Sequence, residues 1–137
     1  MTLWIVISFI SAFFIFLPPD AKKKVMIGKS VFFCSEARSL FSRALGLMLR
    51  KRIADGTGLL FRFSHPMKPS FTSAGMRFSI DIIWFRKGRV SEITEDVSIA
   101  SGKAVVVPKE EVDGCIEVAS GTVRRNNIGL RDTISIY

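Results

Sequence analysis

One carboxylate interrupts an otherwise apolar stretch of the sequence. The run GMRFSIDIIW, residues 75–84, surrounds Asp81 with isoleucine, phenylalanine and tryptophan, and this composition predicts a strand that is covered on both faces. An unpaired carboxylate in such a strand would be strongly unfavourable. Asp81 therefore needs either a structural partner or a chemical role.

Arg77, in the same run, is the first partner to consider. Arg77 and Asp81 fall on one face of a straight strand, but at about 3.3 Å per residue they lie roughly 13 Å apart and cannot form an ion pair. Each residue therefore requires a different partner. The expected partners are Arg43 or Arg50 for Asp81, and Glu36 or Glu117 for Arg77.

We favour an architectural role for Asp81, either in an ion pair or as an acceptor of backbone N–H bonds that lock a turn. Structural ion pairs perturb buried carboxylates just as active sites do, so a buried aspartate alone does not indicate catalysis. The alternative is a hydrolase with a pocket around Arg77 and Asp81. In that alternative Glu36 or Glu117 supplies the second carboxylate that glycoside chemistry requires.

Cys34 and Cys115 are the only cysteines, and His65 is the only histidine. Both cysteines occur in apolar strand patterns, which favours buried and unreactive thiols, with a single disulfide as the alternative if the domain is exported and the strands adjoin. A thiol nucleophile activated by His65 is the weaker hypothesis, because His65 lies in a Ser-His-Pro loop without an orienting third group. The sequence predicts no metal site and no cofactor, since it has one histidine, no paired cysteines and no Asp-rich loop.

The N-terminus carries the strongest hydrophobic signal. No charged residue occurs from Leu3 to Leu17, and Pro18-Pro19 ends this stretch. At about 1.5 Å per residue a helix of this length, with its flanks, just reaches across the roughly 30 Å of a bilayer core. A cleaved signal peptide would begin with Lys or Arg and end in an A-x-A-like site, and neither is present. We therefore expect a single-pass membrane anchor or uncleaved signal at 1–19, a short basic linker at 20–24 and one domain at 25–137.

The net charge of the chain is +8. A basic domain of this kind is attracted to anionic surfaces, so we expect anionic lipid or an anionic envelope polymer as its partner, in addition to the membrane. The basic residues are scattered and not interleaved with aromatic ones, which argues against nucleic acid, and no protein partner is indicated. The lysines Lys22 to Lys24, directly after the apolar stretch, favour the cytoplasmic side, although long domains translocate largely regardless of charge.

Short apolar runs separated by turn residues dominate the rest of the chain. The predicted strands are 25–27 and 30–34, joined by a Gly28-Lys29 turn, then 59–63, 78–85, 90–94, 104–107, 115–118 and 134–136. One amphipathic helix is expected from Leu40 to about Leu49, a connecting segment over 64–70, and one helical turn after Gly121. This pattern predicts a mainly β domain, a compact barrel or a jelly-roll-like sandwich with one helix, preceded by the transmembrane helix.

A set of short motifs follows in a specific order along the domain. The motifs are Gly46-Leu47-Met48 with Arg50, Gly58-Leu59-Leu60-Phe61, and Gly75-Met76-Arg77-Phe78 with Ile80-Asp81. In this order they resemble the domain of unknown function family 192. The resemblance implies a compact β-rich domain, often behind an N-terminal signal or membrane anchor, with no established biochemical activity. Export is common among the relatives, which favours an extracytoplasmic domain against the lysine run, so the side of the membrane stays open.

We therefore interpret the chain as a membrane-anchored β-rich domain that serves as a non-enzymatic binding or envelope-associated module. The hydrolase around Asp81 and Arg77 is the alternative function. A pocket in which Asp81 faces a second acid or a hydroxyl would favour the enzyme, whereas an Asp81 sealed by structural partners would favour the module.

Overall fold

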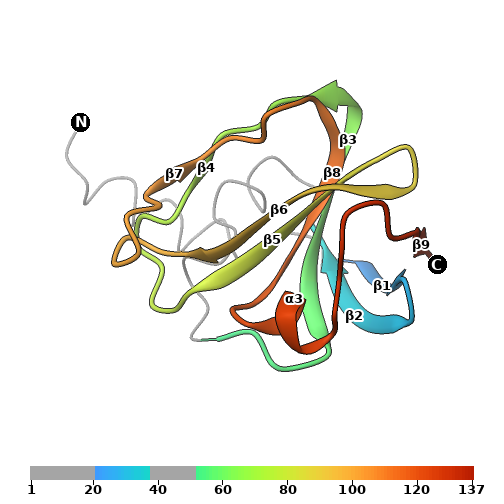
Figure 1. Ribbon diagram of the computed structural model, residues 1–137, viewed down its shortest axis with the longest axis horizontal. Helices are drawn as coiled ribbons and strands as arrows, with labels where there is room; N and C mark the ends of the chain where they lie inside the picture. The colour runs from blue at the N-terminus through green and yellow to red at the C-terminus, as the bar shows by residue number, and fades with distance from the viewer. Residues whose placement is uncertain (1–20, 38–51) are drawn as a thin grey trace.

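The computed structural model describes residues 21–37 and 52–137, and strands dominate both ranges (Figure 1). The elements are β1 (Ala21–Ile27), β2 (Ser30–Glu36), β3 (Thr57–Met67), β4 (Phe71–Thr72), β5 (Ile80–Arg86), β6 (Arg89–Val97), β7 (Val105–Val106), β8 (Val112–Ala119), α3 (Thr122–Arg125) and β9 (Ile134–Ile136). The prediction of a mainly β domain with little helix is confirmed.

A single long sheet organises these strands. Seven strands pair in the order β6-β5-β8-β3-β2-β1-β9, and β4 pairs with β7 in a separate two-stranded sheet. The long sheet curls into a half-barrel, so that the turn between β5 and β6 meets the chain leading into β9 (Figure 1). There the N–H of Ile134 donates to the carbonyl of Gly88 at 2.9 Å, and the N–H of Val90 donates to the carbonyl of Asp132 at 2.9 Å. The sheet is thus a curled half-barrel and not the two stacked sheets of a jelly roll.

The first hairpin confirms the predicted Gly28-Lys29 turn. β1 pairs antiparallel with β2, and Gly28 at the turn has a positive φ of 57°, a conformation that suits glycine. β1 is longer than predicted, however, because it begins at Ala21. Lys22, Lys23 and Lys24, which the sequence assigned to a linker, therefore belong to the sheet, and alternate lysines face opposite sides of it.

β2 and β3 form the one parallel pair among the described strands. Parallel neighbours need a crossover of a dozen or more residues, and residues 37–56 connect these two strands. The helix predicted from Leu40 to Leu49 falls in this crossover and lies outside the described residues. The segment 64–70, predicted as a connection, is strand at its start: β3 continues to Met67 after a register shift against β8.

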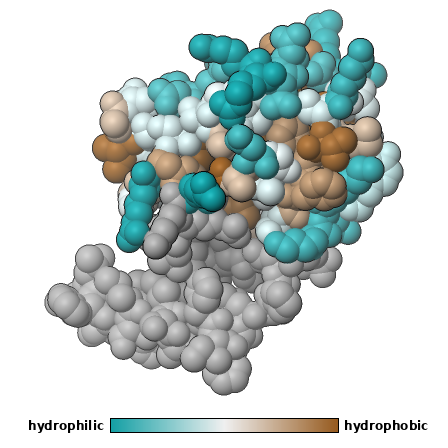
Figure 2. All heavy atoms as spheres, turned by 90° about the horizontal axis from the view of Figure 1, so that it is seen from below, coloured by the Kyte–Doolittle hydropathy of each residue, from teal (hydrophilic) through white to brown (hydrophobic). Residues whose placement is uncertain are grey.

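Hydrophobic clusters cover both faces of the central strands. In β5 the residues alternate, with Ile83 and Phe85 in one cluster and Ile82 and Trp84 in the other. Ile80 to Phe85 are all buried, as predicted from the composition of this run. We call the clusters the α3 cluster and the β7 cluster, because the first includes Val123 of α3 and the second Val106 of β7. At the surface, hydrophilic and hydrophobic groups intermingle over the described face in Figure 2.

Within the described ranges no helix has the length and apolar character needed to cross a membrane. The anchor predicted at residues 1–19 lies outside these ranges.

Candidate functional site

Asp81 is fully buried and is held by three main-chain donors. The N–H of Asp96 donates to Oδ1 at 3.0 Å, and the N–H groups of Gly121 and Val123 donate to Oδ2 at 3.0 and 3.1 Å. These donors come from β6 on one side and from the start of α3 on the other. The negative charge that the sequence places in an apolar strand is therefore compensated by main-chain dipoles.

The donors around Asp81 are groups that the sheet and the helix leave without their usual partners. Asp96 has a positive φ of 53° and lies at a bulge, where the pairing of β5 with β6 shifts register. A bulged residue has no partner in the hydrogen-bond ladder of the sheet, so its N–H can donate elsewhere. Gly121 is the N-cap of α3 and gives no side-chain cap, so the first N–H groups of the helix lack an internal acceptor. Asp81 supplies this acceptor, which is the turn-locking role that the sequence offered as one form of the architectural interpretation.

A small hollow lies beside this carboxylate. It has a volume of about 250 Å³, and the residues around it are Asp81, Glu95, Asp96, Ser120, Gly121 and Arg124. The Ser120 hydroxyl donates to Oδ1 of Asp96 at 3.5 Å. A second acid and a hydroxyl are thus present, but both oxygens of Asp81 already accept main-chain hydrogen bonds. This arrangement holds the carboxylate in place and leaves it poorly suited to accept a substrate proton.

Arg77 and Asp81 form no ion pair, as the sequence predicts, but Arg77 is not on the strand that holds Asp81. Gly75 has a positive φ of 77° in a turn that the N–H of Met76 closes by donating to the carbonyl of Ser73 at 3.0 Å. β5 begins only at Ile80, so Arg77 falls in an exposed bend before the strand. Arg77 forms no ion pair with any described residue, Glu36 and Glu117 included. The expected partners of Asp81, Arg43 and Arg50, lie outside the described residues.

Glu36 pairs with Arg62 instead of Arg77. Arg62 donates from Nε to Oε2 of Glu36 and from Nη2 to Oε1, the second bond at 2.9 Å, so the pair is bidentate. The carboxylate is buried, and its hydrogen bonds raise the pKa of Arg62. The two residues meet because β2 and β3 are parallel neighbours, a pairing that strand order in the sequence does not reveal.

Glu117 is buried on the face of the sheet opposite to Asp81. Asp81 pairs with Val118 of β8, and neighbouring residues of a strand point to opposite sides. Glu117 faces the β7 cluster with Leu59 and Ile82, its partners across the sheet. Glu36 lies on β2, three strands away from β5. The structure therefore does not gather these three carboxylates into the acid pair of a glycosidase.

The two cysteines are free, buried and separated. Cys34 lies on β2 in the α3 cluster and Cys115 on β8 in the β7 cluster, with β3 between them. Two strand spacings are roughly 10 Å, too far for a disulfide. Burial raises the pKa of Cys34 to about 12, and burial together with the charge of Glu117 raises that of Cys115. His65 is exposed with its Nδ1 3.1 Å from Ser64 Oγ, so no Cys-His pair forms.

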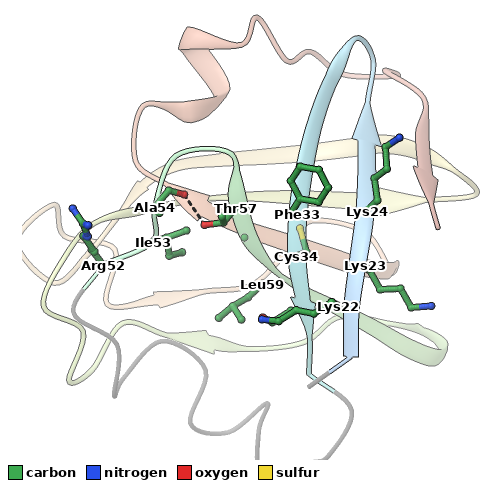
Figure 3. A pocket seen from close by; sticks show the side chains of 12 residues that line it. Lys22, Lys23, Lys24, Phe33, Cys34, Arg52, Ile53, Ala54, Thr57 and Leu59 are labelled. Atoms are coloured by element: carbon green, nitrogen blue, oxygen red, sulfur yellow. Dashed lines mark hydrogen bonds between the residues drawn. The ribbon is translucent and has the colours of Figure 1, made fainter. Parts of the chain in front are cut away.

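A cleft that the sequence did not predict opens between the first hairpin and the start of β3 (Figure 3). Its volume is about 580 Å³, within the range of small-molecule sites. The residues around it are Lys22, Lys23, Lys24, Phe33, Cys34, Ser35, Arg52, Ile53, Ala54, Thr57, Gly58 and Leu59. Four of these described lining residues are basic and none is acidic, so the cleft attracts anions.

Charged and apolar groups take different places in this cleft. Lys22 points toward it from the hairpin, whereas Arg52 stands on the far side (Figure 3). The Lys22 ammonium donates to the Ser35 hydroxyl at 2.7 Å, which fixes the direction of this side chain. Ile53 and Leu59 are buried and give the cleft apolar walls. The arrangement suits a molecule with an anionic group and a short apolar part.

The register of the first hairpin contains the signal for this cleft. The predicted Gly28-Lys29 turn pairs Val25 with Phe32, and continuing the same register pairs Lys24 with Phe33 and Lys22 with Ser35. The sequence interpretation stopped the strand at Val25 because the lysine run resembled a linker. The contribution of residues 52–59 could not be foreseen, because it depends on the parallel pairing of β2 with β3.

A metal site has no support in the described part of the chain. No three histidine, cysteine, aspartate or glutamate side chains within it lie close enough to hold an ion.

Comparison with known proteins places the domain in a group without an assigned activity. The sequence model of the domain of unknown function family 192, DUF192, described as an uncharacterized ACR, matches residues 23–136. No curated protein matches the chain.

Two solved structures share the fold. One is a protein from Sinorhizobium meliloti 1021 described as a candidate transcription regulator, with a TM-score of 0.78 and 22% identity over 87% of this chain and 96% of that one. The other is a protein of unknown function from Novosphingobium aromaticivorans DSM 12444, with a TM-score of 0.74 and 22% identity over 85% of this chain and 84% of that one. At this identity the likeness establishes the fold alone.

Proposed function

The chain belongs to the domain of unknown function family 192, and we propose that it is a membrane-anchored binding module whose cleft takes an anionic ligand with a short apolar part. The observation that carries the proposal is the composition of the cleft, where Lys22 points inward and Arg52 stands on the far side, with buried apolar walls between them (Figure 3). A basic side chain attracts and orients the anionic group of the ligand, and the apolar walls add affinity by burying its hydrocarbon part.

Binding without covalent chemistry fits the state of the one thiol among the described lining residues of this cleft. Cys34 lines the cleft, but its side chain is 1% exposed and burial raises its pKa to about 12. Almost no thiolate exists at neutral pH under these conditions. The cleft is therefore suited to hold a ligand and not to attack it.

Residues 3–17 supply the membrane tether in this proposal. Only Pro18, Pro19 and Asp20 separate this uncharged stretch from Ala21, where β1 begins. The Cα atoms of Leu17 and Ala21 are four residue steps apart, which span roughly 14 Å at most. The end of β1 that carries Lys22 would then lie near the headgroups of the bilayer.

A hydrolase around Asp81 and Arg77 is the alternative that the sequence left open. The three main-chain hydrogen bonds to Asp81 and the exposed position of Arg77 before β5 both weigh against it. We therefore prefer the cleft of Figure 3 to the hollow beside Asp81 as the functional site.

The test measures binding of three probes to the full chain held in phosphatidylcholine nanodiscs. The probes are octyl phosphate below its micelle concentration, octanol and inorganic phosphate, and empty discs correct for partition into lipid. Burial of about four methylenes at roughly 0.8 kcal/mol each predicts that octyl phosphate binds roughly 200-fold more tightly than inorganic phosphate. Octanol should bind weakly because it lacks the charge.

Two variants separate the cleft from a general effect of charge. Arg52→Ala should weaken the binding of octyl phosphate, because Arg52 stands on the rim of the cleft. Lys68→Ala removes an exposed charge just beyond the far end of β3, roughly 30 Å from Thr57, and should leave binding unchanged. Equal affinity for octyl phosphate and inorganic phosphate, or equal effects of the two variants, would contradict the proposal.

A further inference from the structure

The first hairpin and β9 form a small wing whose outer face is exposed. Across the paired strands, Met26 lies opposite Val31 and Ser135, and Lys24 lies opposite Phe33. Tyr137 exchanges both main-chain hydrogen bonds with Lys24, at 3.1 and 2.9 Å, so it extends this ladder by one residue. The inner residues of the same strands, such as Val25 and Phe32, are buried in the α3 cluster. The outer residues therefore share one side, away from the core.

This outer face combines aromatic side chains with lysines. Phe33 is 64% exposed, Tyr137 66% and Val31 38%, and the Lys24 ammonium lies 5.9 Å from the centre of the Tyr137 ring. Lys22 and Lys24 are exposed on the same face. Isolated exposed apolar residues need no explanation, but these three share one face, with Val31 and Phe33 on β2, Tyr137 at the end of β9, and β1 with its lysines between them. Exposed aromatic rings with flanking lysines suit the interface between water and an anionic lipid surface.

Acidic residues are nearly missing from the described strands of this wing. β1 and β9 contain none, and the one acid of β2, Glu36, is buried and paired with Arg62. Lys22 and Lys24 are the charged side chains of the described strands on this face, so it carries a net positive charge and is complementary to phosphatidylglycerol and other anionic headgroups. A second copy of the chain would bring the same lysines together, which disfavours self-association through this face.

We infer that the outer face of β1, β2 and β9 seats against an anionic lipid bilayer, so that the adjoining cleft opens at the level of the headgroups. The inference rests on the proposed function, because the tether at residues 3–17 delivers the chain to β1 within a few residues of Lys22. Lys22 and Phe33 both line the cleft and belong to this face. The anionic group that enters the cleft is then a lipid headgroup.

Seating is measured with a fluorescent label on the full chain in nanodiscs whose lipids carry a headgroup nitroxide. Val31→Cys places the label on the outer face, and Ile99→Cys places it in the exposed loop after β6, at the end of this strand away from the contact of Arg89 with Thr133. The native cysteines are at most 1% exposed and do not compete for the label. Discs of phosphatidylcholine with phosphatidylglycerol are compared with discs of phosphatidylcholine alone.

We expect strong quenching at position 31 in the anionic discs and little at position 99. Replacing Lys22 and Lys24 together by Gln should lower the equilibrium constant for seating by roughly 30-fold, because each lysine near an anionic surface contributes about 1 kcal/mol. Raised salt should also lower the equilibrium constant for seating. The variant changes exposed side chains only, so its melting temperature serves as the control for folding.

Other outcomes would overturn the inference in distinguishable ways. A chain that is recovered outside the disc fraction contradicts the tether and with it the proposed function. A chain in the disc fraction with equal quenching at both positions, or with none at position 31, contradicts the seating alone. Shielding of position 31 only in discs that hold two chains assigns the face to a second copy. A change in the fluorescence at position 31 when soluble polyphosphate is added to neutral discs, without quenching in discs that contain phosphatidylglycerol, assigns the outer face to a soluble polyanion.

Discussion

The main-chain N–H of Val123 donates to Oδ2 of Asp81 at 3.1 Å, which joins residues 42 positions apart in the sequence. The same oxygen accepts from Gly121, and the other oxygen accepts from Asp96. One buried carboxylate on β5 thus links the bulge of β6 to the start of α3. This junction explains why an apolar strand of the domain carries a charge.

Loss of this carboxylate should destabilise the fold. Asp81→Ala leaves three N–H donors without their acceptor, and we expect the free energy of unfolding to fall by about 3 to 5 kcal/mol. Asp81→Asn keeps the shape but turns an amide NH₂ toward at least one of these donors, so a loss of about 1 to 3 kcal/mol is expected. Urea unfolding followed by tryptophan fluorescence measures both variants.

Asp113→Ala is the matched control for Asp81. Asp113 is half-exposed, and it accepts from Arg86 at 3.3 Å and from the N–H of Lys87 at 2.7 Å. Water can replace it, so its removal should cost no more than about 1 kcal/mol. A normal unfolding free energy for Asp81→Ala would contradict the architectural role and reopen the question of catalysis.

Gly114 should tolerate no side chain. A Cβ at this position would lie 2.2 Å from the carbonyl oxygen of Phe61 and 2.5 Å from Cζ of Phe85. Since the first of these contacts is to backbone, relief requires β8 and β3 to separate. Gly114→Ala should therefore lower the free energy of unfolding by about 3 kcal/mol or more.

The control for Gly114 is Gly56, where an added Cβ meets nothing within 4 Å but φ is 73°. Gly56→Ala should cost only about 1 kcal/mol, through backbone strain. Similar losses for the two variants would contradict the close approach of β3 and β8 at Gly114.

The buried thiol of Cys34 should make stability fall in alkaline solution. Its pKa is about 12 in the folded chain against 9.0 for an unshifted thiol. Above pH 9 the unfolded chain loses this proton while the folded chain keeps it, so the free energy of unfolding decreases from pH 9 toward pH 12 and is unaffected below pH 9. The slope contributed by the thiol reaches about 1.4 kcal/mol per pH unit.

Comparison with Cys34→Ala isolates this contribution from the titration of lysines. The variant starts from a lower stability because it creates a cavity, but its decline between pH 9 and 11 should be less steep. The native chain should also resist iodoacetamide at pH 8 until urea unfolds it. Parallel alkaline slopes for the two proteins, or rapid alkylation of the native chain, would argue that Cys34 is not buried in solution.

Local patterns in the sequence predicted most of the strands. Gly28-Lys29 identified the first hairpin, and the apolar run around Asp81 identified the central strand with both faces buried. These features depend on turn chemistry and on alternation within a few residues, so one sequence is enough to reveal them.

Partners across the sheet could not be predicted in the same way. Glu36 meets Arg62 because β2 and β3 are parallel, and Arg77 leaves the strand because a turn at Gly75 precedes it. The main-chain acceptor role of Asp81 was foreseen as an alternative, but its donors at Asp96 and Val123 depend on a bulge and on a short helix. Pairing over long sequence separation is a property of the whole fold.

The most direct test of the cleft as a binding site is the dissociation constant of octyl phosphate for Lys22→Glu, compared with Lys68→Glu. Both substitutions change the net charge by the same amount, but Lys22 points toward the cleft (Figure 3), whereas Lys68 is not among the residues that line it. We predict that Lys22→Glu weakens binding by roughly tenfold or more at low salt, while Lys68→Glu stays close to the unsubstituted chain. Equal dissociation constants for the two variants would contradict the account.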